Sequence, residues 1–163
     1  MKLHIRRAEP ADAAAMSALM LGERSHITLR PDGEGAQAVL ASMDTSSVQA
    51  NLASARFAYW LAILDDRLCG VLGMRDGTHL YHLFVPSALH RQGIARRLWL
   101  HMLSTSTHGG SAPITVNASP FAVPAYEALG FRATGVRTEA NGVAFIPMHF
   151  PVSTHPVFEG APT

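Results

Sequence analysis

A short loop between an apolar strand and an amphipathic helix carries the residues best suited to hold a phosphate group. The apolar run ends at Val85, and His90-Arg91-Gln92-Gly93-Ile94-Ala95 leads into the helix. Backbone N–H groups at a helix N-terminus converge on one point and favour a negative charge there. Gly93 has no Cβ, so a ligand can approach the backbone closely. Arg96 and Arg97 add positive charge that opposes the helix dipole unless an anion binds. The pattern predicts a site for phosphate or pyrophosphate.

A second group of reactive side chains follows about 25 residues later, in residues 115–131. Asn117 ends a short apolar strand, and Ser119 precedes Pro120, the order typical of a helix start. Tyr126 lies within that helix, and Gly130 is placed to end it. A tyrosine hydroxyl can donate a proton to a leaving group of suitable pKa.

The strand that feeds the phosphate loop contains two histidines and no carboxylate. A histidine pKa near 6.5 suits proton abstraction at neutral pH. Strand alternation places His79 and Tyr81 on one face and His82 on the other, and a β-bulge would change that count. His82 lies nearer the phosphate loop, so we expect it to be the better candidate for a general base.

The elements that position these groups follow from hydrophobic periodicity and turn residues. We expect an α+β layered domain over residues 1–150, with a mixed, mostly antiparallel sheet flanked by helices and a right-handed crossover around Gly93. Residues 151–163 are expected to be poorly ordered. Strands are predicted at residues 3–7, 56–64, 68–75, 79–85, 114–118, 131–137 and 143–150, and helices from residue 9, at 34–43, at 46–53, from 93 to about 108 and at 120–129.

Composition excludes several classes of function. Charged residues make up 15% of the 163 residues and the formal net charge is +1, so no basic field for nucleic acid is present. No apolar run approaches the roughly 20 residues that span a bilayer, and the N-terminal residues lack the apolar region of a signal peptide. Cys69 is the single cysteine, and the histidine spacings form no recognised metal-ligand set. We expect a cytoplasmic protein without a metal or a membrane partner.

With these elements in place, the chain resembles the GCN5-related N-acetyltransferases from about Leu3 to Phe150. His90-Arg91-Gln92-Gly93-Ile94-Ala95 is similar to the family's acetyl-CoA pyrophosphate loop, Gln/Arg-x-x-Gly-x-Gly/Ala. Residues 115–131 are similar to a later motif in which a strand carries Asn and a helix ends in Tyr-Glu-x-Leu-Gly-Phe. One position departs, because His90 stands where the family usually has Gln or Arg.

The resemblance implies that acetyl-CoA donates an acetyl group directly to a primary amine in a ternary complex. Tyr126 would be the general acid for the coenzyme A thiolate, and His82, His79 or a water chain would remove the proton of the amine. The backbone of β-strand residues before the loop would pair with the pantetheine arm, and a backbone N–H would polarise the thioester carbonyl. The cofactor-binding residues implied are Leu83, Phe84, Val85, His90, Arg91, Gln92, Gly93, Ile94, Ala95, Arg96, Asn117 and Ser119.

The acceptor is less well defined by the sequence. The resemblance places its selection in residues 23–30 and 139–145, with Glu23, His26, Thr28 and Glu139 as polar candidates. The small size of the chain favours a small-molecule amine, and pairing of the last hairpin makes a homodimer plausible. Two alternatives are a non-catalytic acyl-CoA-binding sensor on the same fold and a dinucleotide enzyme. The second lacks its Gly-x-Gly-x-x-Gly signature here.

Overall fold

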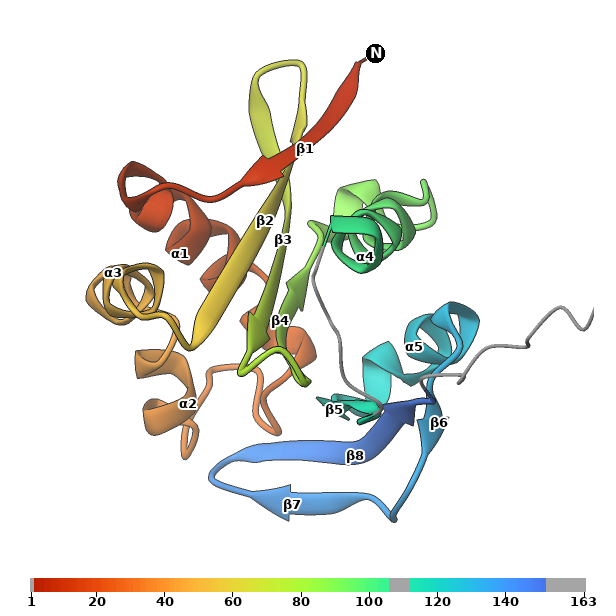
Figure 1. Ribbon diagram of the computed structural model, residues 1–163. Coiled ribbons are helices and arrows are strands. Elements are labelled where there is room, and N and C mark those ends of the chain that lie inside the picture. Colours follow the sequence, from red (N-terminus) through yellow and green to blue (C-terminus); the bar gives the residue numbers. More distant parts are fainter. Residues whose placement is uncertain (1, 106–111, 152–163) are drawn as a thin grey trace, which may run out of the picture.

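A single mixed sheet organises the computed structural model, which describes residues 2–105 and 112–151 (Figure 1). The strand order is β1-β2-β3-β4-β5-β8-β6, and β7 pairs with β8. Neighbours are antiparallel except β4 and β5, which are parallel. The strands are β1 Leu3–Arg7, β2 Phe57–Leu64, β3 Arg67–Arg75, β4 His79–Phe84, β5 Ile114–Ala118, β6 Arg132–Ala133, β7 Thr138–Ala140 and β8 Val143–Phe150. The α+β class and the parallel crossover are confirmed.

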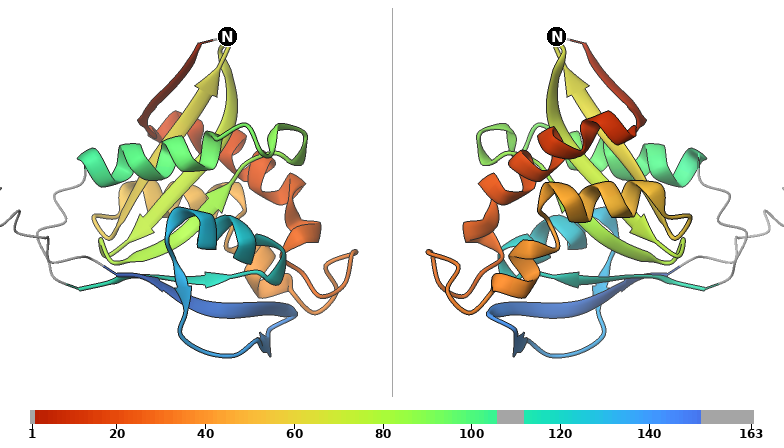
Figure 2. Two further views of the ribbon diagram at one scale, coloured as in Figure 1. Left: turned by 90° about the vertical axis from the view of Figure 1, so that its right-hand side faces the viewer. Right: turned by 90° about the vertical axis from the view of Figure 1, so that its left-hand side faces the viewer.

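Helices cover both faces of this sheet (Figure 2). Helices α1 (Ala13–Gly22) and α3 (Thr45–Ala53) bury Met16, Met20 and Val48 against one face, and α2 (Gln37–Ala41) follows the same side. Helices α4 (Ile94–Thr105) and α5 (Val123–Leu129) lie on the other face, where Leu98 and Trp99 are buried. The two faces are called below the α1/α3 face and the α4/α5 face. Within the described ranges, no helix has the length and apolar character needed to cross a membrane.

Local sequence signals explain most element ends. The turns at Asp65-Asp66, Asp76-Gly77 and Asn141-Gly142 have positive φ at both residues, which Asp, Asn and Gly tolerate best. Gly130 ends α5 in the left-handed conformation at φ 105°. Asp44 caps α3 by accepting a hydrogen bond from the Ser47 N–H at 2.8 Å. The hairpin turns and the end of α5 at Gly130 match the sequence prediction, and α3 begins one residue before its predicted start.

Two predicted strands differ in the structure. Strand β4 ends at Phe84 rather than Val85, and a short 3-10 helix, η3 (Ser87–Leu89), follows it. The strand predicted at 131–137 is broken into β6 and β7, with Gly135 so close to Pro147 that a Cβ would lie 2.8 Å from its Cγ. The end of the helix predicted near residue 108 and the tail beyond residue 151 lie outside the described residues.

The sheet divides between β4 and β5. These parallel strands pair at His79–Thr115 and Leu80–Val116 and at no later position of the described chain. The edge of β4 that faces β5 is therefore open from Tyr81 to Phe84. This opening leads directly to η3 and the N-terminus of α4, where the sequence predicts the phosphate site.

Candidate active site

The loop before α4 presents a run of free backbone donors. Within the described chain, the N–H groups from Arg91 to Arg96 have no protein acceptor, and the first bond of the helix runs from the Arg97 N–H to the Gly93 carbonyl at 3.0 Å. Arg91 and Gly93 have φ of 63° and 78°, so the loop curls into a concave group of N–H donors. A Cβ on Gly93 would meet open space. The arrangement fits an anion at the positive end of the 12-residue helix α4.

The side chain of His90 is engaged with the backbone of its own turn. Its Nε2–H donates to the Val85 carbonyl at 2.6 Å, which braces the passage from β4 to the phosphate loop. The Val85 carbonyl therefore already holds a hydrogen bond, and the open backbone edge lies at Leu83 and Phe84. The phenyl ring of Phe121, just before α5, lies 6.1 Å from the His90 ring.

Tyr126 carries a buried hydroxyl that has no protein hydrogen-bond partner among the described residues. The residue is 7% exposed and its ring packs edge-on against Phe131 at 5.4 Å. Burial raises the pKa of the phenol, so the hydroxyl keeps its proton at neutral pH. A buried hydroxyl without a partner is costly to the folded protein.

Asn117 and Ser119 lie on the other strand of the opening and at its end. Asn117 is exposed on β5, between the buried Val116 and Ala118. Ser119 occupies the cap position of the 3-10 helix Pro120–Ala122 (η4), but its side chain forms no capping bond. Both polar side chains lack a protein partner within the described residues, so both are available to a ligand.

The structure argues against His82 as a general base. A β-bulge leaves Tyr81 unpaired between the His82–Gly73 and Leu80–Met74 pairs. The rings of Tyr81 and His82 consequently lie 4.3 Å apart on one face, so the alternation that put them on opposite faces was wrong. The Tyr59 hydroxyl lies 3.0 Å from His82 Nδ1 and accepts a hydrogen bond from Asn51 Nδ2 at 3.2 Å. Burial lowers the pKa of His82 to about 3.

His79 lies at the closed end of the opening, away from the loop. Its Nδ1 lies 2.8 Å from the Thr115 hydroxyl, across the first pair of β4 and β5. Burial, with a contribution from Arg75, lowers its pKa. Because the contact with Thr115 joins β4 to β5, the His79 side chain is held away from the phosphate loop.

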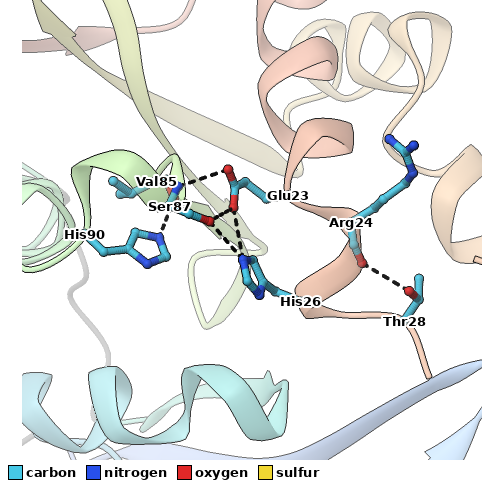
Figure 3. Close-up of polar contacts among 7 residues, drawn as sticks. All are labelled: Glu23, Arg24, His26, Thr28, Val85, Ser87 and His90. Carbon is cyan, nitrogen blue, oxygen red and sulfur yellow. Dashed lines mark hydrogen bonds and ion pairs between the residues drawn. The ribbon is translucent and has the colours of Figure 1, made fainter. Parts of the chain in front are cut away.

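At the other end of β4, a cluster of polar side chains joins segments that lie far apart in the sequence (Figure 3). Glu23, at the end of α1, accepts from the Ser87 N–H at 3.0 Å through Oε1 and from the Ser87 hydroxyl at 2.5 Å through Oε2. Since the Ser87 proton goes to Glu23, the hydroxyl oxygen accepts from His26 Nε2–H at 2.9 Å. The His26 ring stacks on Phe121 with centroids 4.0 Å apart.

The pKa of Glu23 reflects two opposing effects. Burial of the carboxyl would raise the pKa, but the two hydrogen bonds from Ser87 and the nearby His26 and His90 outweigh it. The net shift is downward, so the carboxylate is ionised throughout the neutral range. The sequence marked Glu23 and His26 as polar candidates for the acceptor, and it gave no signal that Ser87, 64 residues away, holds the carboxylate.

The two segments expected to select the acceptor lie side by side. Thr28 forms an isolated bridge with Val143, and the Leu29 N–H donates to the Gly142 carbonyl at 2.9 Å. A Cβ on Gly142 would collide with the backbone of Gly35, so the hairpin tip and the segment between α1 and α2 are in close contact. Glu139 forms an exposed ion pair with Arg137 at 2.6 Å.

Several solved acetyltransferase structures are similar to this architecture. A GCN5-related N-acetyltransferase from Rhodopseudomonas palustris superposes with a TM-score of 0.77 at 20% identity, covering 93% of this chain and 97% of that one. The PaiA N-acetyltransferase from Thermoplasma acidophilum, in complex with coenzyme A, gives 0.70 at 13% identity over 91% and 98% of the chains. An aminoglycoside 6′-N-acetyltransferase complexed with coenzyme A gives 0.69 at 18% identity over 94% and 99%. These similarities show a shared fold.

The family itself is identified by the sequence match. Residues 27–151 match the model of the acetyltransferase (GNAT) domain. No sequence match was found among curated proteins. The chain belongs to the GNAT family of acetyltransferases.

Proposed function

We propose that this protein moves an acetyl group from acetyl-CoA to the primary amine of a small molecule by direct attack in a ternary complex. The observation that carries the proposal is the run of free N–H donors from Arg91 to Arg96, placed beside the open edge of β4. The first feature fits a pyrophosphate, and the second fits an extended amide-containing arm that adds to the sheet as a strand would. The two similar structures with coenzyme A bound support the same reading.

Each part of the site then has a chemical task. The loop around Gly93 binds the pyrophosphate, and Leu83 and Phe84 offer the backbone groups for the pantetheine arm. A backbone N–H on this edge polarises the thioester carbonyl as the amine nitrogen attacks its carbon. When the carbon–sulfur bond breaks, the coenzyme A thiolate takes the Tyr126 proton. A thiol pKa of about 8.5 makes this transfer helpful without being obligatory.

The proton of the attacking amine leaves through water in this proposal. His82 is a weak base in its buried position, because its pKa of about 3 lies far below neutral pH. His79 is held by Thr115 at the closed end of the opening. The sequence left three routes open for this proton: His82, His79 and a water chain. The low pKa of His82 and the Thr115 contact of His79 disfavour the two histidines, so we propose the water chain.

The decisive experiment is a thiol-release assay with acetyl-CoA over a panel of primary amines. Release that depends on the amine supports acetyl transfer and identifies the acceptor class. The alternative is a non-catalytic acyl-CoA sensor, which predicts tight binding of coenzyme A with no release for any amine. Tyr126 on α5, at the position for which the resemblance implies a general acid, favours the enzyme.

A cytoplasmic location and a homodimer remain predictions from the sequence. The β7–β8 hairpin is the surface that we expect to pair between copies. Light scattering during size-exclusion chromatography would measure the mass of the particle directly.

A further inference from the structure

Glu23 is one of two partly buried acids of the described chain, with Asp44, that have no permanently charged partner. Five carboxylates lie within 4 Å of an arginine: Asp12, Asp32, Glu34, Asp76 and Glu139. Asp44 caps α3, and the other acids of the described chain are exposed. The Glu23 side chain is 16% exposed, and the basic group beside it is His26, whose Nε2 lies 3.4 Å from Oε2. The groups that hold the Glu23 carboxylate are therefore the two Ser87 donors and a histidine, and no arginine or lysine of the described chain pairs with it.

The location of Glu23 points toward the acceptor. The carboxylate comes from α1, on the α1/α3 face, and reaches Ser87 just beyond the end of β4. The pyrophosphate loop and Tyr126 belong to α4 and α5, on the opposite face. Acetyl-CoA therefore approaches the opening from the α4/α5 face, and Glu23 lies on the side that remains for the amine.

The hydrogen bonds of Glu23 make it an anion with a fixed orientation. Ser87 donates to both carboxylate oxygens, and His26 holds the Ser87 hydroxyl while stacking on Phe121 of η4. Three elements thus position one carboxylate. An ionised carboxylate has about four acceptor sites, so capacity remains for a further donor. Groups prearranged in this way lose little entropy when a ligand binds.

The chemistry of transfer restricts what that donor can be. An amine must be neutral when it attacks a thioester, so a cation that Glu23 holds during the reaction is a different group of the acceptor. We infer that Glu23 binds a second cationic group of the acceptor, so that diamines and amines bearing a guanidinium are preferred over simple monoamines. This inference rests on the proposed acetyl transfer and adds the class of acceptor.

The test compares α,ω-diamines of increasing length with the monoamines of the same length. In the wild type, the diamine of best length should exceed its monoamine by about 10- to 100-fold in kcat/KM, the effect of one charge-assisted contact. Glu23→Gln keeps the shape of the side chain and should abolish that preference through KM, with kcat changed by less than about threefold. Glu34→Gln removes an exposed acid of the α1–α2 segment and should behave as wild type. Affinity for coenzyme A should be equal in all three proteins.

Each other outcome has a defined meaning. Equal kcat/KM for diamine and monoamine, or a preference that survives Glu23→Gln, overturns the inference and leaves acetyl transfer standing. Weaker binding of coenzyme A together with an equal loss for every amine would make Glu23 a structural residue, which also overturns it. If no amine is acetylated, calorimetry with the coenzyme A complex decides. Diamine binding that is lost in Glu23→Gln supports the cation site without the enzyme, and no diamine binding rejects the site.

Discussion

Replacing Tyr126 by phenylalanine should affect stability and turnover in opposite directions. The ring is 7% exposed and packs against Phe131, and phenylalanine keeps that packing. The hydroxyl has no protein partner among the described residues, so its removal breaks no protein hydrogen bond. Since an unpaired buried hydroxyl costs about 1–3 kcal/mol, we expect the ligand-free variant to be more stable by about 1 kcal/mol.

The same substitution removes the proposed proton donor to the thiolate. General acids contribute roughly 10²- to 10⁴-fold, and a thiolate is a good leaving group, so a fall in kcat of about 100-fold is expected. Affinity for acetyl-CoA should change by less than about twofold, because Tyr126 donates mainly as the bond breaks. Urea unfolding, steady-state kcat and a coenzyme A titration measure the three quantities. A kcat within about threefold of wild type would remove Tyr126 from the mechanism.

Tyr59→Phe is the matched control. The Tyr59 hydroxyl bonds Asn51 and His82, so its loss should destabilise the protein by about 1–2 kcal/mol while kcat stays near wild type. A destabilised Tyr126→Phe would show that its hydroxyl has a partner in the folded protein, and the stability reasoning would then be wrong. Because burial raises the pKa of Tyr126, the wild-type rate should show no decline from this group up to pH 9.

Three further substitutions test other parts of the structure. Gly93→Val places a side chain at φ 78°, which costs roughly 1–2 kcal/mol, and should weaken coenzyme A binding by about tenfold or more in calorimetry; unchanged affinity would place the pyrophosphate elsewhere. Because the pKa of His82 is about 3 when folded and about 6.5 when unfolded, the unfolded chain binds the proton first as the pH falls. Between pH 6.5 and 3, His82 should therefore lower the free energy of unfolding by up to about 1.4 kcal/mol for each pH unit of acidification. In His82→Gln, the free energy of unfolding from urea titrations at several pH values should depend less steeply on pH. Asp44→Ala removes the α3 cap and should cost about 1 kcal/mol with kcat unchanged, so a loss of activity in the native variant would contradict a purely structural role.

The parts of the fold that the sequence predicts are those governed by neighbouring residues. Asn141-Gly142 and Asp76-Gly77 form tight turns because these residue types accept positive φ. Gly93 marks the loop before α4 for the same reason. The buried stripe of α4, which includes Ile94, Leu98 and Met102, follows from spacing alone.

The parts that could not be predicted depend on contacts between distant segments. The sequence of β4 does not reveal the bulge at Tyr81. Aromatic residues occur at both alternating sets of positions in this strand, so the pattern looks the same with or without the bulge. The pKa of His82 falls because Tyr59 and other residues of distant elements enclose it, which the composition of its own strand does not reveal. Glu23 meets Ser87 only because α1 ends above the turn after β4.

The open edge of β4 has a consequence for handling and survival of the protein. Unpaired strand edges act as templates for strand addition by another chain, which leads to aggregation. An extended ligand that fills the gap beside Leu83 and Phe84 shields these backbone groups, and a ligand at 100 times its Kd adds about 2.7 kcal/mol of stability. On the proposed function, we expect solubility to depend on the supply of the substrate: dialysis that removes coenzyme A should expose the edge, and adding it back should protect the edge again.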